Sequence, residues 1–272
     1  MKVRLFIVLT ILVFLSSCGE YEKLQKSTDY DLKKTKAKEY FDAGKYVKSS
    51  ELLGQILPRY RATEEAEDLT WMNAQSFYGM KDYMSAGGYF KSYIEQYPYG
   101  KHAEESNYMS ALCDYNMSPR AELDQDYTRA AIEGFNFFLN RYPSSSRTEE
   151  CKKLLKVLQE KLVEKSYLSA KLYYDMTQYK SAVTALSNSL KEYSESKYRE
   201  EMMYLKLSSL FLYAQNSMAN KQRERYQATL DDYFSFMEEF PESKYIRDVK
   251  RIYQATAKIL NIGAEKIEAN NQ

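Results

Sequence analysis

The sequence predicts an all-α protein built from repeated helix pairs, and three observations support this class. Glycine and proline are scarce, with 9 and 5 among 272 residues, so few tight turns can form. Aromatic residues make up 15% of the chain and 27 of them are Tyr, which suits thin helical layers that bury the ring and leave the hydroxyl hydrated. The third observation is an apolar pattern with helical spacing that returns five times along the chain.

The same composition excludes several classes of function. The glycine patterns of a Rossmann fingerprint and of a Walker loop occur nowhere in the sequence. A formal charge of +1, from 39 basic and 38 acidic side chains, lacks the basic excess of a nucleic-acid-binding protein. A mean hydropathy of −0.63 also argues against a polytopic membrane protein.

The first residues have the pattern of a bacterial lipoprotein signal peptide. Two basic residues precede the apolar run 5–15, which is too short to span a bilayer. The tetrad Leu15-Ser16-Ser17-Cys18 is similar to a lipobox, in which the cysteine thiol is diacylated and becomes the mature N-terminus. We therefore predict a signal peptide over 1–17, lipidation of Cys18 by acyl chains such as palmitate, and a lipidated polar tether over 18–30. A plain secretory signal with an incidental cysteine is the alternative.

Five later segments repeat one helical pattern. They begin at Tyr46, Tyr83, Thr128, Tyr179 and Tyr226. Three residues further on lies a small side chain: Ser49, Ala86, Ala131, Ala182 or Thr229. Large apolar or aromatic residues follow at offsets 7, 11 and 14, so each segment presents one apolar face of an α-helix. Pro98, Pro143 and Pro241 end three of these helices.

A partner helix is predicted upstream of each segment. Small residues occupy the matching point of these first helices: Ala37, Ala74, Ala111, Ala170 and Ser208. Small side chains let two helices approach closely, and this arrangement is the pattern of the tetratricopeptide (TPR) repeat. The connections inside the third and fifth pairs are longer, through residues 117–119 and around 216–223, and we predict extended loops there.

The repeats together predict a superhelical solenoid closed by a capping helix. The expected repeat boundaries are 31–61, 62–98, 101–143, 147–194 and 198–241. The cap is predicted over 244–267, with a polar tail over 268–272, and the apolar face of the cap is assigned to Tyr245, Val249, Ile252, Ala255 and Ile259.

Side chains suited to catalysis or metal binding are few. His102 is the only histidine, and the paired carboxylates fall mostly at helix starts, where they meet the positive end of the helix dipole. We therefore predict no enzymatic activity, no metal site and no cofactor. Cys113 and Cys151 could form a disulfide or remain free thiols, and the sequence leaves both possibilities open.

Aromatic residues on the first helices of the first two repeats are the candidates for ligand contact. Phe41, Trp71 and Tyr78 are predicted to bind a peptide on the concave face that the first helices form. The alternative for these residues is the core between helices, which we predict for Tyr40 and Phe77.

A lipobox followed by five TPR units and a cap resembles the BamD family, the lipoproteins of the bacterial outer-membrane β-barrel assembly (BAM) complex. The densest match lies within 124–183, in Asp124-Gln125-Asp126, in Arg141-Tyr142-Pro143 with its three following serines, and in the long helix 153–174. The resemblance implies a non-catalytic scaffold, lipid-anchored on the periplasmic side of the outer membrane. The partners it implies are unfolded β-barrel precursors and a BamA-like POTRA protein, with no nucleic acid.

The chain departs from the family pattern at one turn. Family members often carry Arg-Gly between the helices of the fourth repeat, at a position linked to the BamA contact. Here the turn reads Asp175-Met176-Thr177-Gln178, so we predict that the contact rests on Tyr174, Met176 and Tyr179. The main alternative function is another TPR lipoprotein that scaffolds cell-division or peptidoglycan factors. A glycan-binding lipoprotein would use the tyrosines as platforms, and no nucleophile or metal cluster supports a peptidoglycan hydrolase.

Overall fold

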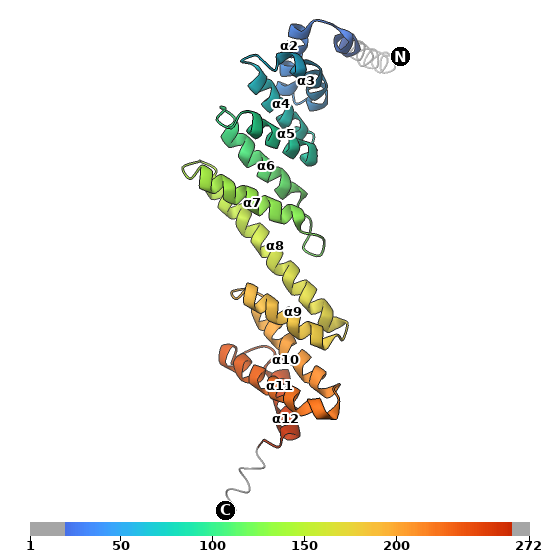
Figure 1. Cartoon of the computed structure of the whole chain (residues 1–272), viewed down its shortest axis with the longest axis vertical. Coiled ribbons are helices and arrows are strands. Elements are labelled where there is room, and N and C mark those ends of the chain that lie inside the picture. Colours follow the sequence, from blue (N-terminus) through green and yellow to red (C-terminus); the bar gives the residue numbers. More distant parts are fainter. Residues whose placement is uncertain (1–19, 263–272) are drawn as a thin grey trace, which may run out of the picture. The chain divides into compact units, whose positions relative to one another are not determined.

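The structure is a computed structural model that describes residues 20–262 of the chain, and all regular secondary structure in this range is helical (Figure 1). The signal peptide 1–17, Cys18 and the tail 268–272 lie outside the described residues. A helix over 20–26 is followed by α2 (Tyr30–Asp42), α3 (Tyr46–Tyr60), α4 (Ala66–Gly79), α5 (Tyr83–Gln96), α6 (Ala103–Met117), α7 (Asp126–Arg141), α8 (Thr148–Asp175), α9 (Tyr179–Glu192), α10 (Arg199–Gln215), α11 (Ala219–Glu239) and α12 (Ile246–Leu260). The predicted all-α class of stacked TPR helix pairs is confirmed.

The chain divides into two compact units. The first unit comprises the residues up to Pro119 together with 125–158, and the second comprises 120–124 and the residues from Gln159 onward. The long helix α8 therefore contributes its residues up to Leu158 to the first unit and the remainder to the second.

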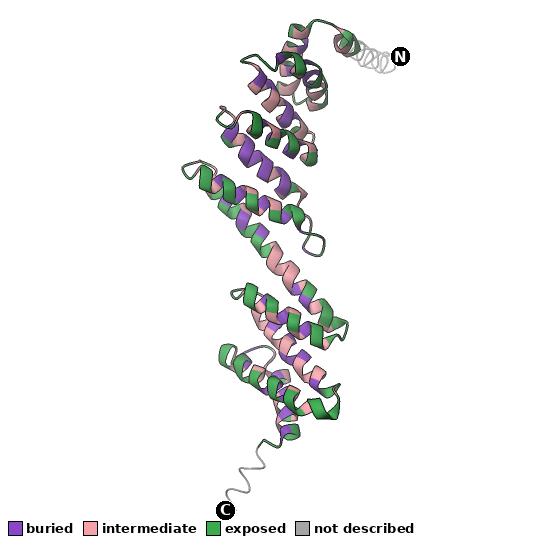
Figure 2. Cartoon of the chain, in the orientation of Figure 1, coloured by how far each residue is buried: buried purple, intermediate pink, exposed green. Residues whose placement is uncertain are grey.

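The first unit stacks the pairs α2/α3, α4/α5 and α6/α7, and each helix packs on the next. The small residues predicted at the close approaches are buried: Ala37, Ala74, Ala111, Ser49, Ala86 and Ala131. The tightest approach joins α6 and α7, where a Cβ added to Gly134 would lie only 2.8 Å from the Ala111 Cβ. Helix α6 carries the longest run of buried residues in this unit, Ser106 to Ala111 (Figure 2).

The second unit packs α9 and α11 on α10, and α12 covers α10 and α11. Ala182, Leu186 and Met202 form the core beside the second part of α8, while Leu207, Phe236 and Val249 form the core under α12. The predicted apolar face of α12 is wrong at Ile259, which is 48% exposed. Thr256 and Leu260 are buried instead, since they continue the row that starts at Val249 and Ile252.

Two further details of the predicted repeat are wrong. The residues at offset 10 of the second helices are buried (Ile56, Tyr93, Phe138, Ser189 and Phe236), whereas those at offset 11 are only half-buried. Each second helix is covered both by its own first helix and by the next one, so its buried face is turned toward offset 10. The expected loop at 216–223 is largely helical, because α11 begins at Ala219, seven residues before Tyr226.

The short turns inside three pairs share one backbone conformation. Gly44, Lys81 and Thr177 have φ values of 68°, 62° and 60°, which lie in the left-handed region. In each turn the next amide donates a hydrogen bond across the helix end: Lys45 N to Tyr40 O (2.8 Å), Asp82 N to Phe77 O (3.1 Å) and Gln178 N to Tyr173 O (2.9 Å). This closure satisfies carbonyls at the helix end and favours glycine, so Lys81 and Thr177 adopt it at a conformational cost.

The two cysteines of the described residues are buried free thiols in the first unit. Burial raises the pKa of the Cys113 thiol to about 12 and that of the Cys151 thiol to about 11. Of the two possibilities that the sequence left open, the structure shows the free thiols.

Candidate binding surfaces

The first unit brings two of the predicted peptide-binding residues together on its first helices. Phe41, at the end of α2, lies 6.4 Å from the ring of Trp71 on α4. On the other side of the indole, the ring of His102 stacks at 4.3 Å, just before α6. Phe41, Trp71 and His102 are all half-buried and line up across three successive first helices.

The indole of Trp71 packs against the core of the first unit. Its Nε1 atom is buried and has no hydrogen-bond partner within the part of the chain that the structure describes. His102 is positioned over the ring by Asp68, whose Oδ1 lies 2.8 Å from His102 Nε2 and 2.6 Å from Lys101 Nζ. Partial burial raises the pKa of Asp68, but the hydrogen bonds from Lys101 and His102 outweigh this effect and leave that pKa below its usual value.

The third predicted residue, Tyr78, lies two turns further along α4 from Trp71. Its ring meets Tyr83 edge-on at 5.4 Å and packs against the core of the first unit. Burial raises the pKa of its hydroxyl. Tyr78 therefore combines a core contact with a half-exposed edge, as Trp71 does.

A regular contact, not predicted from the sequence, joins successive first helices. In each contact a residue on one first helix touches the residue that directly precedes the next first helix, or the capping helix in the last contact. We call these two residues a junction pair. The junction pairs are Lys34/Glu65 (ion pair, 2.7 Å), Trp71/His102 (rings 4.3 Å apart), Tyr108/Arg147 (cation over ring, 4.1 Å), Tyr167/Tyr198 (4.3 Å) and Tyr204/Tyr245 (4.2 Å). Trp71 thus has a structural role in addition to any contact with a ligand.

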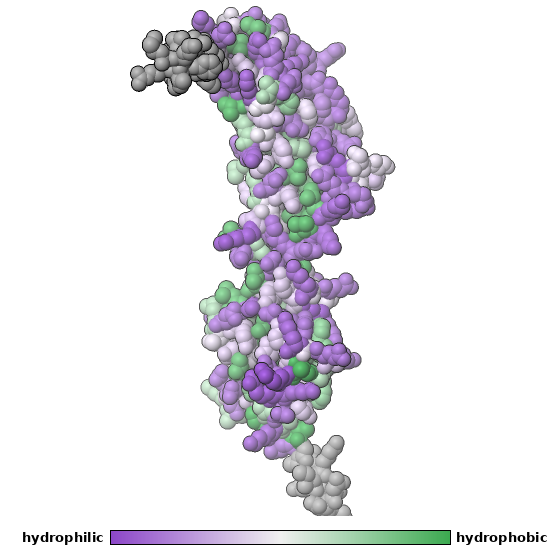
Figure 3. Space-filling view, turned by 180° about the vertical axis from the view of Figure 1, so that it is seen from behind, coloured by the Kyte–Doolittle hydropathy of each residue, from purple (hydrophilic) through white to green (hydrophobic). Residues whose placement is uncertain are grey.

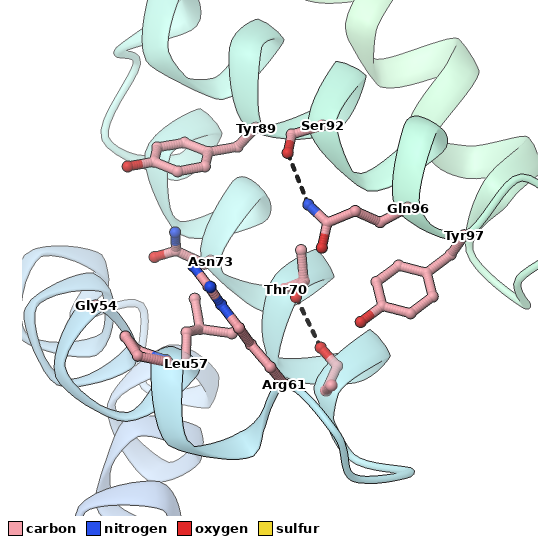
Figure 4. Close-up of a pocket in the computed structure, with 11 residues that line it drawn as sticks. Gly54, Leu57, Arg61, Thr70, Asn73, Tyr89, Ser92, Gln96 and Tyr97 are labelled. Carbon is pink, nitrogen blue, oxygen red and sulfur yellow. Dashed lines mark hydrogen bonds between the residues drawn. The ribbon is translucent and has the colours of Figure 1, made fainter.

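A groove opens on the opposite side of α4. Figure 4 shows its lining from three helices: Gly54 and Leu57 of α3, Thr70 and Asn73 of α4, and Tyr89, Ser92 and Gln96 of α5, with Arg61 and Tyr97. Asn73 is 3% exposed, and its Oδ1 has no hydrogen-bond partner among the described residues. The sequence could have indicated this buried polar residue. Asn73 directly precedes the small Ala74, and at position 73 the repeat pattern expects an apolar residue that faces the previous helix pair.

The predicted docking residues lie together in the second unit. Tyr174 is half-buried and meets the ring of Tyr179 edge-on at 6.0 Å across the turn. Met176 is 54% exposed between them. Leu172, one helical turn before Met176, is 56% exposed and was not predicted, although its i, i+4 spacing could have indicated a shared face.

A second groove lies beside Tyr174. It is lined by Tyr204, Ser208 and Phe211 of α10 and by Asp248, Ile252 and Ala255 of α12. Burial is the main cause that raises the pKa of the Tyr174 hydroxyl above its usual value.

Neither a metal cluster nor a membrane-spanning helix is evident in residues 20–262. No group of three or more potential ligands among His, Cys, Asp and Glu is found in this range. No helix in the same range is long and apolar enough to cross a membrane. On the face shown in Figure 3, apolar side chains form separate patches within a largely hydrophilic surface.

The family model YfiO, described as outer membrane lipoprotein, matches residues 33–201. The chain belongs to the YfiO family of outer membrane lipoproteins. This is the family of the BamD lipoproteins, so the predicted resemblance is confirmed. Membership in the YfiO family, together with the stacked helix pairs, supports a scaffold in the cell envelope.

Solved TPR structures are similar to the chain at low identity. The TPR2AB domain of yeast Sti1, from a structure described as a pHSP90 complex, has 14% identity and a TM-score of 0.38, covering 84% of this chain and 98% of that one. A putative kinesin light chain with nearly identical TPR-like repeats, from Podospora anserina, has 15% identity and a TM-score of 0.34, covering 78% of this chain and 96% of that one. No curated protein matches the chain.

Proposed function

We propose that this YfiO-family lipoprotein is a non-catalytic scaffold of outer-membrane β-barrel assembly. In this proposal the first helices of the first unit receive unfolded barrel precursors, and the second unit docks on the POTRA domains of a BamA-like protein. A lipid on Cys18 holds the chain on the periplasmic side of the outer membrane. Family membership supports the general role, and the exposed apolar turn at Met176 is the observation that carries the docking step.

The turn at Met176 suits a docking contact because it presents an exposed apolar side chain on an ordered backbone. Three backbone hydrogen bonds of 2.9 Å fix it, donated by the amides of Met176, Thr177 and Gln178. Leu172 and Met176 lie one helical turn apart and are both more than half exposed. A preorganised apolar surface binds without a large ordering cost, and the absence of Lys and Arg from residues 175–178 predicts a contact that salt screens weakly.

The docking step is tested by calorimetry with the POTRA region of the BamA-like protein from the same organism. Met176→Asp should weaken binding by about 1–3 kcal/mol, because the new carboxylate would lose its hydration in an apolar contact. Ile259→Asp is the matched control, since Ile259 is 48% exposed in the same unit and belongs to the last helix, α12, rather than to a turn between paired helices. A steep loss of affinity with salt, together with normal binding by Met176→Asp, would exclude this docking surface.

Precursor binding can be followed through the only tryptophan of the chain, Trp71. A peptide from the last strand of an outer-membrane barrel should change the emission of Trp71 and reduce its quenching by acrylamide. Phe41→Ala should weaken binding of the peptide by about 1–2 kcal/mol if the Phe41 ring contacts it. Phe137→Ala, on the exposed surface of α7 in the same unit, is the control. If both variants titrate like the parent protein, the peptide binds elsewhere.

The lipid anchor has its own test. Cys18→Ala should give an unprocessed or soluble protein, because no other anchor is predicted. Incorporation of radiolabelled palmitate into that variant would contradict lipidation at Cys18.

A further inference from the structure

The residues that follow Cys18 form a docked helix, although the sequence predicts a polar tether. Residues 20–26 are helical, and Tyr21 and Leu24 pack on the core of the first repeat. The Tyr21 ring lies 5.6 Å from that of Tyr40 and beneath the ammonium of Lys48, and its hydroxyl donates to Glu51. Gln25 donates a second hydrogen bond of 2.8 Å to the same carboxylate.

A buried lysine binds the C-terminal end of this helix. Lys33 of α2 is only 4% exposed, and its ammonium donates to the backbone carbonyl of Gln25 (2.8 Å) and to Oε1 of Gln55 on α3 (2.6 Å). A cation at the C-terminal carbonyls of a helix is favourable, and a buried ammonium that lost both acceptors would be costly. Lys33 therefore joins the N-terminal helix to both helices of the first repeat.

We propose that this docked helix holds the first repeat against the phospholipid headgroups, an inference that rests on the proposed lipid anchor at Cys18. Only Gly19 lies between Cys18 and Glu20, and a fully extended chain spans at most about 3.6 Å per residue, so the two residue steps cover at most about 7 Å. A flexible tether running from Cys18 to Tyr30 would instead wander by about 5–6 Å × √12, or about 20 Å. The docked helix thus sets a short and fixed spacing between the lipidated Cys18 and the first repeat, where a flexible tether would allow a long and variable one.

The exposed side of the helix indicates which lipid surface it meets. Glu20, Glu22, Lys23 and Lys26 are exposed, so two acidic and two basic groups face outward. This balance fits a zwitterionic headgroup layer and predicts that attachment depends on the acyl chains and little on anionic lipid or salt.

The docking is tested first without any lipid, in the mature chain carrying Cys18→Ala. Amides of residues 24–27 should be protected from hydrogen exchange, since their acceptors lie within the helix, and trypsin should cleave slowly after Lys26. Tyr21→Ala with Leu24→Ala should raise cleavage after Lys26 at least about tenfold, whereas Glu20→Ala with Glu22→Ala should leave it unchanged. Unprotected amides in the parent chain would overturn the docked helix, whatever becomes of the proposed function.

The spacing is then tested with the lipidated full chain in phosphatidylcholine vesicles. A fluorophore at Val47→Cys, an exposed position of α3, is quenched by spin labels attached to the headgroups. We expect strong quenching in the parent chain and at least a twofold loss in the Tyr21→Ala, Leu24→Ala variant, with little change when anionic lipid is added. Equal quenching in both chains would overturn the membrane contact even if the helix proves to be docked. Lys33→Met provides a second route to release the helix, and it should give the same loss.

Discussion

The two units join their repeats at the same place with different chemistry. In the first unit each junction pair includes an ionisable partner: Glu65 with Lys34, His102 with Trp71, and Arg147 with Tyr108. In the second unit both junction pairs are stacked tyrosines, Tyr167/Tyr198 and Tyr204/Tyr245. The geometry of the repeat demands a contact at this point but does not fix its type, so salt should distinguish the units.

The Arg147 junction shows how far the first unit relies on charge. Its guanidinium covers the Tyr108 ring and also donates to both oxygens of Glu105, at 2.9 and 3.1 Å. In the second unit the Tyr167/Tyr198 rings lie parallel at 4.3 Å, and the Tyr167 hydroxyl donates to Glu201 at 2.7 Å. A cation–π contact and a stacked aromatic pair are each worth about 0.5–1.5 kcal/mol. Both lie beside ion pairs, since Lys171 is 3.2 Å from Glu201 and donates to the Tyr167 hydroxyl, but only at Tyr108/Arg147 does the charged group itself form the junction contact that salt screens.

The largest expected effect comes from the close helix approaches and tests whether the units unfold separately. Ala131→Leu in the first unit and Ala182→Leu in the second should each destabilise by about 1–3 kcal/mol, because both alanines are fully buried where helices meet. Ala86→Leu should act like Ala131→Leu. Denaturant melts of each variant should shift the transition of its own unit, and Ala228→Leu on the exposed side of α11 should shift neither. Unchanged midpoints would mean that the assigned helix contacts are wrong.

The junction pairs provide the next test. Arg147→Leu and Tyr198→Leu should each cost about 1–2 kcal/mol at low ionic strength. In 1 M salt the cost of Arg147→Leu should fall, since the parent chain has already lost part of that interaction, while the cost of Tyr198→Leu should change less, because that substitution removes a ring and no ion pair. Identical salt responses of the two variants would contradict the difference between the units.

The left-handed turns predict a gain of stability in the second unit. Thr177→Gly should stabilise by about 1 kcal/mol, because a β-branched residue at φ 60° is strained and glycine is not. Gly44→Thr, at the same turn position in the first unit, should destabilise by about the same amount. Thr184→Gly, inside α9, is the control and should lower stability slightly. A loss of stability in Thr177→Gly would show that the threonine makes compensating contacts.

The smallest and most general expectation concerns alkaline pH. Burial, helped by the Glu67 and Glu201 hydrogen bonds, raises the pKa of Tyr93 in the first unit and of Tyr167 in the second. The folded state therefore keeps protons that the unfolded state releases above about pH 10, so the contribution of these tyrosines to stability should be constant below that value and fall as pH rises beyond it. Denaturant melts between pH 8 and 11, with tyrosinate absorbance as the second probe, check this. A flat stability profile would exclude buried, protonated tyrosines.

The sequence predicted those features that recur at fixed spacing. Ala37, Ala86 and Ala131 are buried as expected, because small residues at a constant offset mark close helix approaches. The junction pairs were not predicted from the sequence, because each pair joins residues on either side of a loop of variable length. The residue types also change from an ion pair to stacked rings, so no constant pattern marks them. The docked helix at 20–26 was not predicted either, because its anchor Lys33 is a residue type that is almost never buried.

The reactivity of the two buried thiols reports the opening of the first unit. Cys113 and Cys151 both belong to it, and a thiol reacts only when solvent reaches it and the proton is lost. With pKa values raised to about 12 and about 11, neither thiol reacts at an appreciable rate while the unit is closed. The rate of alkylation in native buffer therefore reports how often this unit opens, without any label and without a signal from the other unit. It also means that a chain exported to an oxidising compartment is protected from thiol oxidation once the first unit, including the part of α8 that carries Cys151, has closed.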